Sequence, residues 1–231
     1  MHSLDRRQFL RRAGAAALVP LIPSLFGDQV SSYGPEYNDM LVAYMSERLN
    51  RLATKWDAIR KEVTTAAGLK QRNALVREKL RTMIHGLPVR TPLAPVIVKR
   101  FDRRGYRVEN VMFQSRPNFW VTGNLYIPTT GTGPFAGVIS PCGHYPEARM
   151  EPEYQFAYLN LVRNGFVVLA YDPIGQGERR QYWDPQTNTT EVATASTYEH
   201  SMPGQVLLMM QEDLTQYRIW DGMRGIDYLL T

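Results

Sequence analysis

The chain has 231 residues, of which 44% are hydrophobic and 21% charged, and its formal net charge is +5. This composition is typical of a globular protein and excludes a wholly disordered, collagen-like or coiled-coil chain. The single cysteine excludes a disulfide scaffold and a metal site built from several cysteines. No apolar run reaches the roughly 20 residues that a membrane-spanning helix needs.

The N-terminal segment has the pattern of a twin-arginine export signal. The pair Arg6-Arg7 precedes a weakly apolar stretch at 13–26 that two prolines interrupt. A basic head before a short apolar segment is typical of such signals. We therefore expect residues 1–30 to be a signal peptide read by the twin-arginine export machinery, and the protein to be periplasmic or extracellular. The prolines and the short length predict no stable membrane anchor. The alternative is a chance arginine pair before an apolar helix.

Two helical patterns follow. Apolar residues recur every three or four positions from Leu41 to Val63, which predicts a helix within 36–64. A second pattern at 69–85 ends where Gly86 and Pro88 interrupt it. We assign 31–90 to an N-terminal helical segment.

Positive charge is concentrated at 47–107, which holds 16 basic and 5 acidic residues. Such a block can bind nucleic acid. No nucleic-acid motif accompanies it, so we interpret it as a solvated helical face and expect no nucleic-acid partner.

The remaining residues, 91–231, alternate strand and helix patterns and predict an α/β fold. Apolar and β-branched runs predict strands at 96–101, 106–113, 119–127, 135–140 and 166–171. Helices are expected at 152–164 and 204–230, with a long loop at 173–203 between the last strand and the last helix. A strand–helix–strand–helix order implies parallel strands with crossover helices, while the leading strands are expected to be antiparallel.

Two loops after consecutive buried strands carry most of the residues suited to chemistry. The first reads Ser-Pro-Cys-Gly-His-Tyr at 140–145, and the second reads Asp-Pro-Ile-Gly-Gln-Gly-Glu-Arg at 172–179. In open α/β sheets, ligands bind where the carboxyl ends of the strands meet such loops.

In this order, the two loops resemble those of the α/β-hydrolase superfamily, and in particular its secreted branch of acetyl xylan esterases and prolyl-oligopeptidase-like esterases. The segments at 105–109, 119–128 and 220–229 support the resemblance, which runs from about residue 90 to the end. It implies a fold that begins like the hydrolase sheet. It also implies hydrolysis of carboxylic esters, such as those of acetylated polysaccharide, by acyl transfer through a serine, with no cofactor.

The resemblance also assigns candidate site residues. The backbone N–H groups of His144 and Tyr145 are the candidate oxyanion donors. Gly143, Tyr182 and Trp183 are weaker candidates for binding a small-molecule or polysaccharide ester substrate, the two aromatics as a wall for a sugar or aryl group.

The sequence departs from this family in one respect that concerns catalysis. None of its serines has glycines two residues to either side, so the Gly-x-Ser-x-Gly elbow of the nucleophile is missing from these 231 residues. The catalytic acid and histidine follow the serine in that family. We therefore expect a truncated hydrolase, a partial domain at 91–231 without a triad, that is inactive alone.

Other readings use the same residues differently. A triad of Ser140, His144 and Asp172 can be imagined, but its order differs from that of the family, and Asp172 is expected to brace its own turn. A prolyl-oligopeptidase-like peptidase fragment and a non-catalytic carbohydrate-binding module are the alternative functions.

Smaller expectations concern single residues. Cys142 is expected to be a small buried side chain, and Asp221 to pair with Arg224 across one helical turn. Glu199 and His200 are expected to be a solvated pair in the long loop. The histidines lack metal-ligand spacing, so no metal site is predicted.

Overall fold

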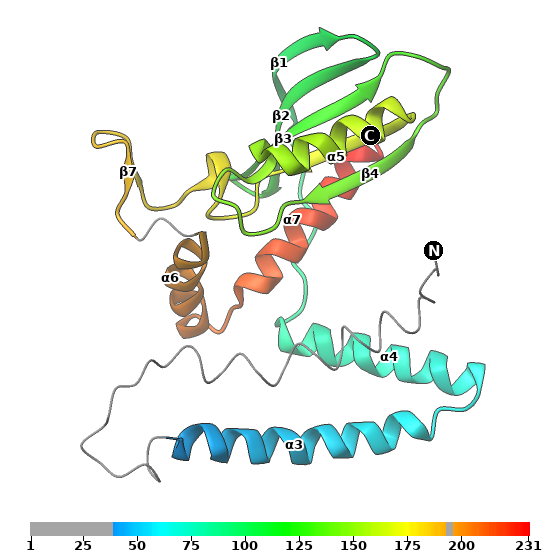
Figure 1. Ribbon diagram of the computed structural model, residues 1–231, viewed down its shortest axis with the longest axis vertical. Helices are drawn as coiled ribbons and strands as arrows, with labels where there is room; N and C mark the ends of the chain where they lie inside the picture. The colour runs from blue at the N-terminus through cyan, green and yellow to red at the C-terminus, as the bar shows by residue number, and fades with distance from the viewer. Residues whose placement is uncertain (1–38, 193–195) are drawn as a thin grey trace, which may run out of the picture. The chain divides into compact units, whose positions relative to one another are not determined.

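The computed structural model describes residues 39–192 and 196–231 (Figure 1). The segment expected to be a signal peptide lies outside these residues. The chain divides into two compact units, Met1–Arg72 and Asn73–Thr231. Helix α3 (Met40–Lys61) lies in the first, and helix α4 (Ala66–Met83) begins there and ends in the second. Both confirm the helices predicted from periodicity. No helix in the described part of the chain is both long and apolar enough to cross a bilayer.

The second unit is built on a mixed five-stranded sheet with the order β1-β2-β3-β5-β4. Its strands are β1 (Val96–Arg103), β2 (Tyr106–Arg116), β3 (Phe119–Pro128), β4 (Ala136–Pro141) and β5 (Phe166–Tyr171). The first three form an antiparallel meander, β5 runs antiparallel to β3, and β4 runs parallel to β5. Helix α5 (Pro152–Arg163) connects the parallel pair. The α/β fold class and the change from antiparallel to parallel strands are therefore as predicted.

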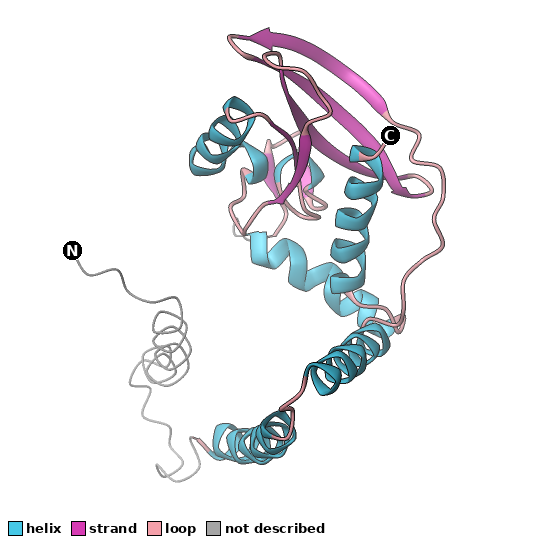
Figure 2. Ribbon diagram, turned by 90° about the vertical axis from the view of Figure 1, so that its right-hand side faces the viewer, coloured by secondary structure: helices cyan, strands magenta, loops and turns pink. Residues whose placement is uncertain are grey.

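Helices cover both faces of the sheet (Figures 1 and 2). Side chains of β5 alternate between two apolar clusters, one on each face. Val168 and Ala170 pack with Tyr158 of α5. Leu169 and Tyr171 lie in the other cluster, against which helix α7 (Leu214–Leu229) packs. Because successive strand residues point to opposite faces, the two helices cover opposite sides of the sheet. Burial on both faces explains the continuous apolar run of β5.

Helix α7 is fixed by hydrogen bonds to residues more than 100 positions earlier in the chain. The buried indole N–H of Trp220 donates to the Ser115 carbonyl of β2 at 2.7 Å. The side-chain amide of Gln216 donates to the carbonyls of Ile84 and Gly86, both at 3.0 Å. These bonds join α7 to β2 and to the segment that follows α4.

The region after β5 differs from the prediction of a long loop. It contains a short hairpin, β6 (Trp183–Asp184) and β7 (Thr189–Thr190), and helix α6 (Ser196–Met209) begins within the expected loop. The sequence does not predict the hairpin, because strands of two residues are too short to show an alternating pattern. It does not predict the start of α6, because Pro203 lies inside this helix and a proline normally predicts an interruption.

The single helix expected at 204–230 is also wrong, because α6 and α7 are separate. Gln211 between them has a positive φ of 60°, which a continuous helix does not allow. Asp213 then starts α7 by accepting a hydrogen bond from the Thr215 N–H at 2.6 Å. This is the usual N-cap arrangement.

Candidate active site

The two loops singled out in the sequence meet at the carboxyl ends of β4 and β5. These strands are parallel neighbours, so their following loops leave the same edge of the sheet. The Gly177 N–H of the second loop donates at 2.9 Å to the carbonyl of Pro146, the residue that follows the first loop. A site formed by both loops is therefore possible.

Three consecutive carbonyls of the first loop are held by side chains from elsewhere. Gln176 is fully buried, and its Nε2 donates to the carbonyls of Gly143 and Tyr145, both at 2.6 Å. Both neighbours are acceptors, so the nitrogen of the amide must face them. The Ser196 hydroxyl donates to the intervening carbonyl of His144. The three peptide oxygens are thus fixed in place.

The N–H groups of the same loop are used differently. Gly143 donates to the Tyr154 hydroxyl at 3.0 Å, and a Cβ at Gly143 would lie 2.4 Å from that oxygen, so glycine allows the contact. The N–H groups of His144 and Tyr145 find no acceptor within residues 39–192 and 196–231, and both residues are exposed. Two adjacent, fixed N–H donors can stabilise negative charge that develops on an oxygen.

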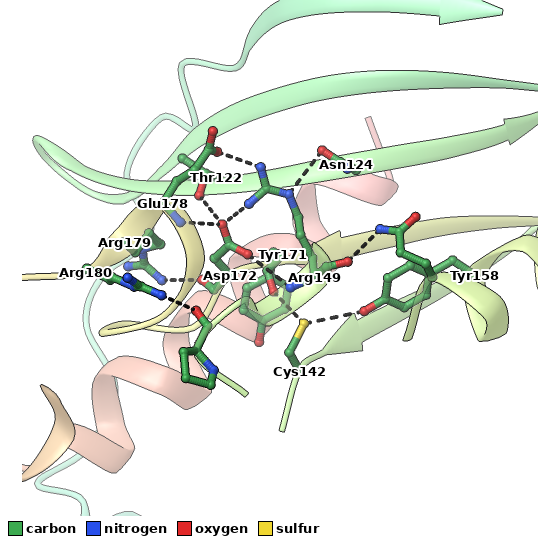
Figure 3. Close-up of polar contacts among 12 residues, drawn as sticks. Thr122, Asn124, Cys142, Arg149, Tyr158, Tyr171, Asp172, Glu178, Arg179 and Arg180 are labelled. Atoms are coloured by element: carbon green, nitrogen blue, oxygen red, sulfur yellow. Dashed lines mark hydrogen bonds and ion pairs between the residues drawn. The ribbon is translucent and has the colours of Figure 1, made fainter. Parts of the chain in front are cut away.

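A buried carboxylate fixes the second loop (Figure 3). Asp172 has no exposed surface and accepts hydrogen bonds from the Thr122 hydroxyl at 3.0 Å and the Glu178 N–H at 3.1 Å. It also accepts a bond from the Arg149 N–H at 3.3 Å and forms an ion pair with the Arg149 guanidinium. Asp172 therefore braces its own turn, as the sequence predicted.

Arg149, which sequence analysis does not single out, connects the loops to the sheet. Its Nε donates to Asn124 of β3 at 3.1 Å and its Nη2 to the Glu178 carboxylate at 2.6 Å. Its side chain is 6% exposed. A buried charge of this kind is tolerated only when it is paired and hydrogen-bonded, as it is here.

Glycine at position 177 is required by the same carboxylate. Gly177 has a φ of +56°, and a Cβ there would lie 2.5 Å from the Asp172 carboxyl carbon. A larger residue would meet both backbone strain and a collision with a buried, hydrogen-bonded group.

The ion pair expected between Asp221 and Arg224 is wrong. Asp221 is buried and accepts a bond from Arg179 at 2.7 Å, while Arg179 also donates to the Asp172 carbonyl at 3.0 Å. Arg224 pairs instead with Asp227 on the next turn of α7. Helical spacing alone misses Arg179, because it approaches α7 from the second loop.

The structure also corrects the interpretation of Glu199 and His200. Both lie in α6, and Glu199 is buried, where its carboxylate accepts bonds from the Gln181 N–H at 2.8 Å and the Thr190 hydroxyl at 3.3 Å. This pair is therefore not a solvated loop pair. The missed start of α6 explains the error.

His200 lies against the candidate oxyanion loop. Its ring centroid is 5.3 Å from that of His144, and its Nε2 is 2.8 Å from the Ile174 carbonyl. Burial, followed by the positive charge of Arg218, lowers the pKa of His200 from its ordinary value. His200 brings a second imidazole to a loop where sequence spacing suggests only one.

Neither the imagined triad nor a thiol nucleophile is supported. In the part of the chain that the structure describes, no hydrogen bond joins Ser140, His144 and Asp172. Cys142 is buried as predicted, with its Sγ 3.4 Å from the Tyr158 hydroxyl. Burial raises the pKa of the Cys142 thiol, which disfavours the reactive thiolate.

Within residues 39–192 and 196–231, no three His, Cys, Asp or Glu side chains lie together in an arrangement that could hold a metal ion. The residues seen there therefore offer no assembled metal site. Charge in this region is balanced by ion pairs between side chains instead.

The two candidate aromatic residues line different cavities. Trp183 lines a cavity of about 350 Å³ together with Pro146 and Ser196, which adjoin the oxyanion loop. Tyr182 lines a mainly apolar cavity of about 230 Å³ that includes Phe119 and residues of α6 and α7. Tyr182 and Trp183, although adjacent in sequence, therefore line two different cavities.

Comparisons with known proteins agree with this fold. No family model and no curated protein matches the chain. Among solved structures, it is similar to a protein from Bacteroides fragilis provisionally classed as an acetyl xylan esterase, with 21% identity and a TM-score of 0.60 over 72% of this chain and 44% of that one. It is also similar to a methylesterase, with 21% identity and a TM-score of 0.52 over 75% of this chain and 35% of that one.

These matches show that the chain shares part of the fold of these two solved structures, in agreement with the α/β fold expected from the sequence. The chain spans less than half the length of either structure, at 44% and 35%.

The Asp172–Arg149 pair gives a test of what holds the two loops together. Replacing Asp172→Asn leaves the buried guanidinium without its fully buried partner, so the free energy of unfolding should fall by about 3–5 kcal/mol. The matched control is Asp102→Asn, which removes an exposed carboxylate that pairs with Arg107 at 2.9 Å and should cost less than about 1 kcal/mol. Urea unfolding measures both. Equal losses in the two variants would contradict the role given to Asp172.

Proposed function

We propose that the chain provides the oxyanion-stabilising side of a serine-type hydrolase of carboxylic esters, with acetylated polysaccharide as the leading substrate class. The observation that carries this proposal is the anchoring of three consecutive carbonyls by Gln176 and Ser196, beside the N–H groups of His144 and Tyr145. We place ester hydrolysis ahead of peptide hydrolysis because the two similar structures are a protein provisionally classed as an acetyl xylan esterase and a methylesterase.

The chemical role of the loop follows from the reaction. When a serine oxygen attacks an ester carbonyl, the carbon becomes tetrahedral and the carbonyl oxygen gains negative charge. The N–H groups of His144 and Tyr145 would donate to that oxygen. Because their peptide units are already fixed, little reorganisation is needed as the charge develops. A single such donor typically contributes about 10²–10³ in kcat.

The serine of this reaction is not supplied by these 231 residues in the usual motif. No serine in the sequence lies between glycines two positions away on each side. The acid and the histidine that would activate it are also unassigned. In this proposal, these residues supply the oxyanion donors and the surrounding substrate surface, but not the nucleophile.

The chain alone should not hydrolyse esters by a serine mechanism. Purified protein, shown to be folded by circular dichroism, should hydrolyse 4-nitrophenyl acetate no faster than its Ser140→Ala variant. Turnover that the Ser140→Ala change abolishes would place the nucleophile in the first loop and contradict the proposal.

The same experiment extends to the reading frame that includes the DNA following codon 231. An in-frame Gly-x-Ser-x-Gly there should yield an active esterase. In that product, Gln176→Leu should lower kcat about 100-fold and change KM little, because only transition-state stabilisation is lost. Unchanged kcat in a folded Gln176→Leu variant, or the absence of a nucleophile motif from the frame, would refute the proposal.

We further propose that the protein is exported by the twin-arginine machinery to the periplasm or beyond. The supporting observation is the Arg6-Arg7 pair ahead of a short apolar segment. Changing both arginines to lysine keeps the charge and should leave the protein in the cytoplasm, as measured by cell fractionation. The control changes Arg11 and Arg12 to lysine and should export normally. Export of the Arg6/Arg7 variant at the normal level would contradict this proposal.

A further inference from the structure

The cavity at Trp183 has a lining that suits a sugar ring. The aromatic residue Trp183, which is 37% exposed, lines it. Hydroxyl and amide groups from Asn188, Thr189 and Thr190 lie on the same hairpin. Sugar rings present apolar C–H faces and hydroxyls that both donate and accept, so a flat aromatic surface beside mixed polar groups recognises them. Pockets with one apolar wall and a few directed polar groups are typical ligand sites.

The aromatic wall is held in position by its own hairpin. Asp184, next to Trp183, accepts bonds from the Gln186 N–H at 2.8 Å and the Thr187 hydroxyl at 2.7 Å, which closes the turn. Arg180 then places its guanidinium 5.0 Å from the centre of the Trp183 ring. A wall fixed before binding reduces the entropy that a ligand would otherwise have to remove.

Arg180 also connects this wall to the candidate oxyanion donors. Its Nη2 donates to the Pro146 carbonyl at 3.3 Å, one residue after Tyr145 (Figure 3). Pro146 and Ser196 both line the cavity, and Ser196 is the residue that holds the His144 carbonyl. A ligand in this cavity would therefore lie next to the loop that is proposed to bind the ester.

The charges around the cavity favour a neutral sugar over an acidic one. Its lining contains one guanidinium, from Arg180, and two carboxylates, from Glu147 and Glu199. The Glu199 carboxylate is engaged by Gln181 and Thr190, whereas Glu147 is exposed and can accept bonds from hydroxyls. A sugar carboxylate would meet net negative charge here.

We propose that the cavity bounded by Trp183, Arg180, Asn188 and Glu147 is a subsite for a neutral sugar unit of a polysaccharide. This position would place an ester on that sugar, or on its neighbour, at the N–H groups of His144 and Tyr145. The orientation of the ligand rests on the proposed ester hydrolysis. Binding of the sugar does not, and it can be measured on this chain without turnover.

Isothermal titration calorimetry of the full 231-residue chain tests the subsite, with xylohexaose, cellohexaose and mannohexaose as neutral probes and hexagalacturonate as the acidic probe. At least one neutral probe should bind, and more tightly than hexagalacturonate. Trp183→Ala should weaken that binding at least about tenfold, or about 1.4 kcal/mol. The control is Phe156→Ala, which removes another exposed aromatic ring, on α5 and outside the cavity, and should bind as the unchanged chain does.

A second variant guards against loss of folding. Asn188→Ala, at the tip of the hairpin, should also weaken binding, and circular dichroism melting identifies any variant that has unfolded. The inference is overturned if no neutral probe binds at millimolar concentration, if folded Trp183→Ala and Asn188→Ala bind normally, or if hexagalacturonate binds best. Saccharide binding without esterase activity in the longer reading frame would refute only the proposed function. Esterase activity without saccharide binding would refute only the subsite.

Discussion

The candidate site depends on one buried amide. Gln176 donates both of its side-chain hydrogens to carbonyls of the neighbouring loop, and its side chain has no exposed surface. Each of these hydrogen bonds typically contributes about 0.5–1.5 kcal/mol to stability. Together with the Ser196 hydroxyl, Gln176 fixes the peptide units of residues 143–145. Because these peptide units are fixed, the N–H groups of His144 and Tyr145 are held in place to donate to a ligand oxygen.

An ion pair stabilises the second loop, whereas hydrogen bonds from an uncharged amide stabilise the first. The Asp172–Arg149 pair lies beneath the second loop and connects it to β3 through Asn124 and Thr122. The pair matters for stability chiefly because removing one partner would leave the other as an unpaired buried charge, which is costly; the net attraction between the two ions contributes less. Gln176 is uncharged and holds the first loop by hydrogen bonds alone.

The sequence predicts the sheet well because strand patterns are local. The five strands, the two N-terminal helices and α5 all follow from apolar runs and their periodicity. The change from antiparallel to parallel pairing follows from where helix α5 occurs. The region from 183 to 213 is different, because its strands have two residues each and Pro203 lies within a helix. The strands of this region are too short to show a pattern, and the proline predicts an interruption where the structure has a helix.

The candidate site is only half visible in the sequence. The loops at 140–145 and 172–179 stand out because each follows a buried strand and contains glycine. Arg149 and Gln176 do not stand out, because their partners lie 23 and 33 residues away. His200 is singled out, but as a loop residue, because Pro203 hides the helix that contains it. Trp183 and Tyr182 are neighbours in sequence, and only the hairpin shows that they face separate cavities.

Residue-resolved amide hydrogen exchange tests the central claim most directly, because it reports on each N–H of the first loop. The Gly143 amide, bonded to Tyr154, should exchange slowly, while the amides of His144 and Tyr145 should exchange close to their unprotected rates in the same folded protein. Protection of His144 and Tyr145 equal to that of Gly143 would show that these N–H groups are already bonded, and would contradict the account.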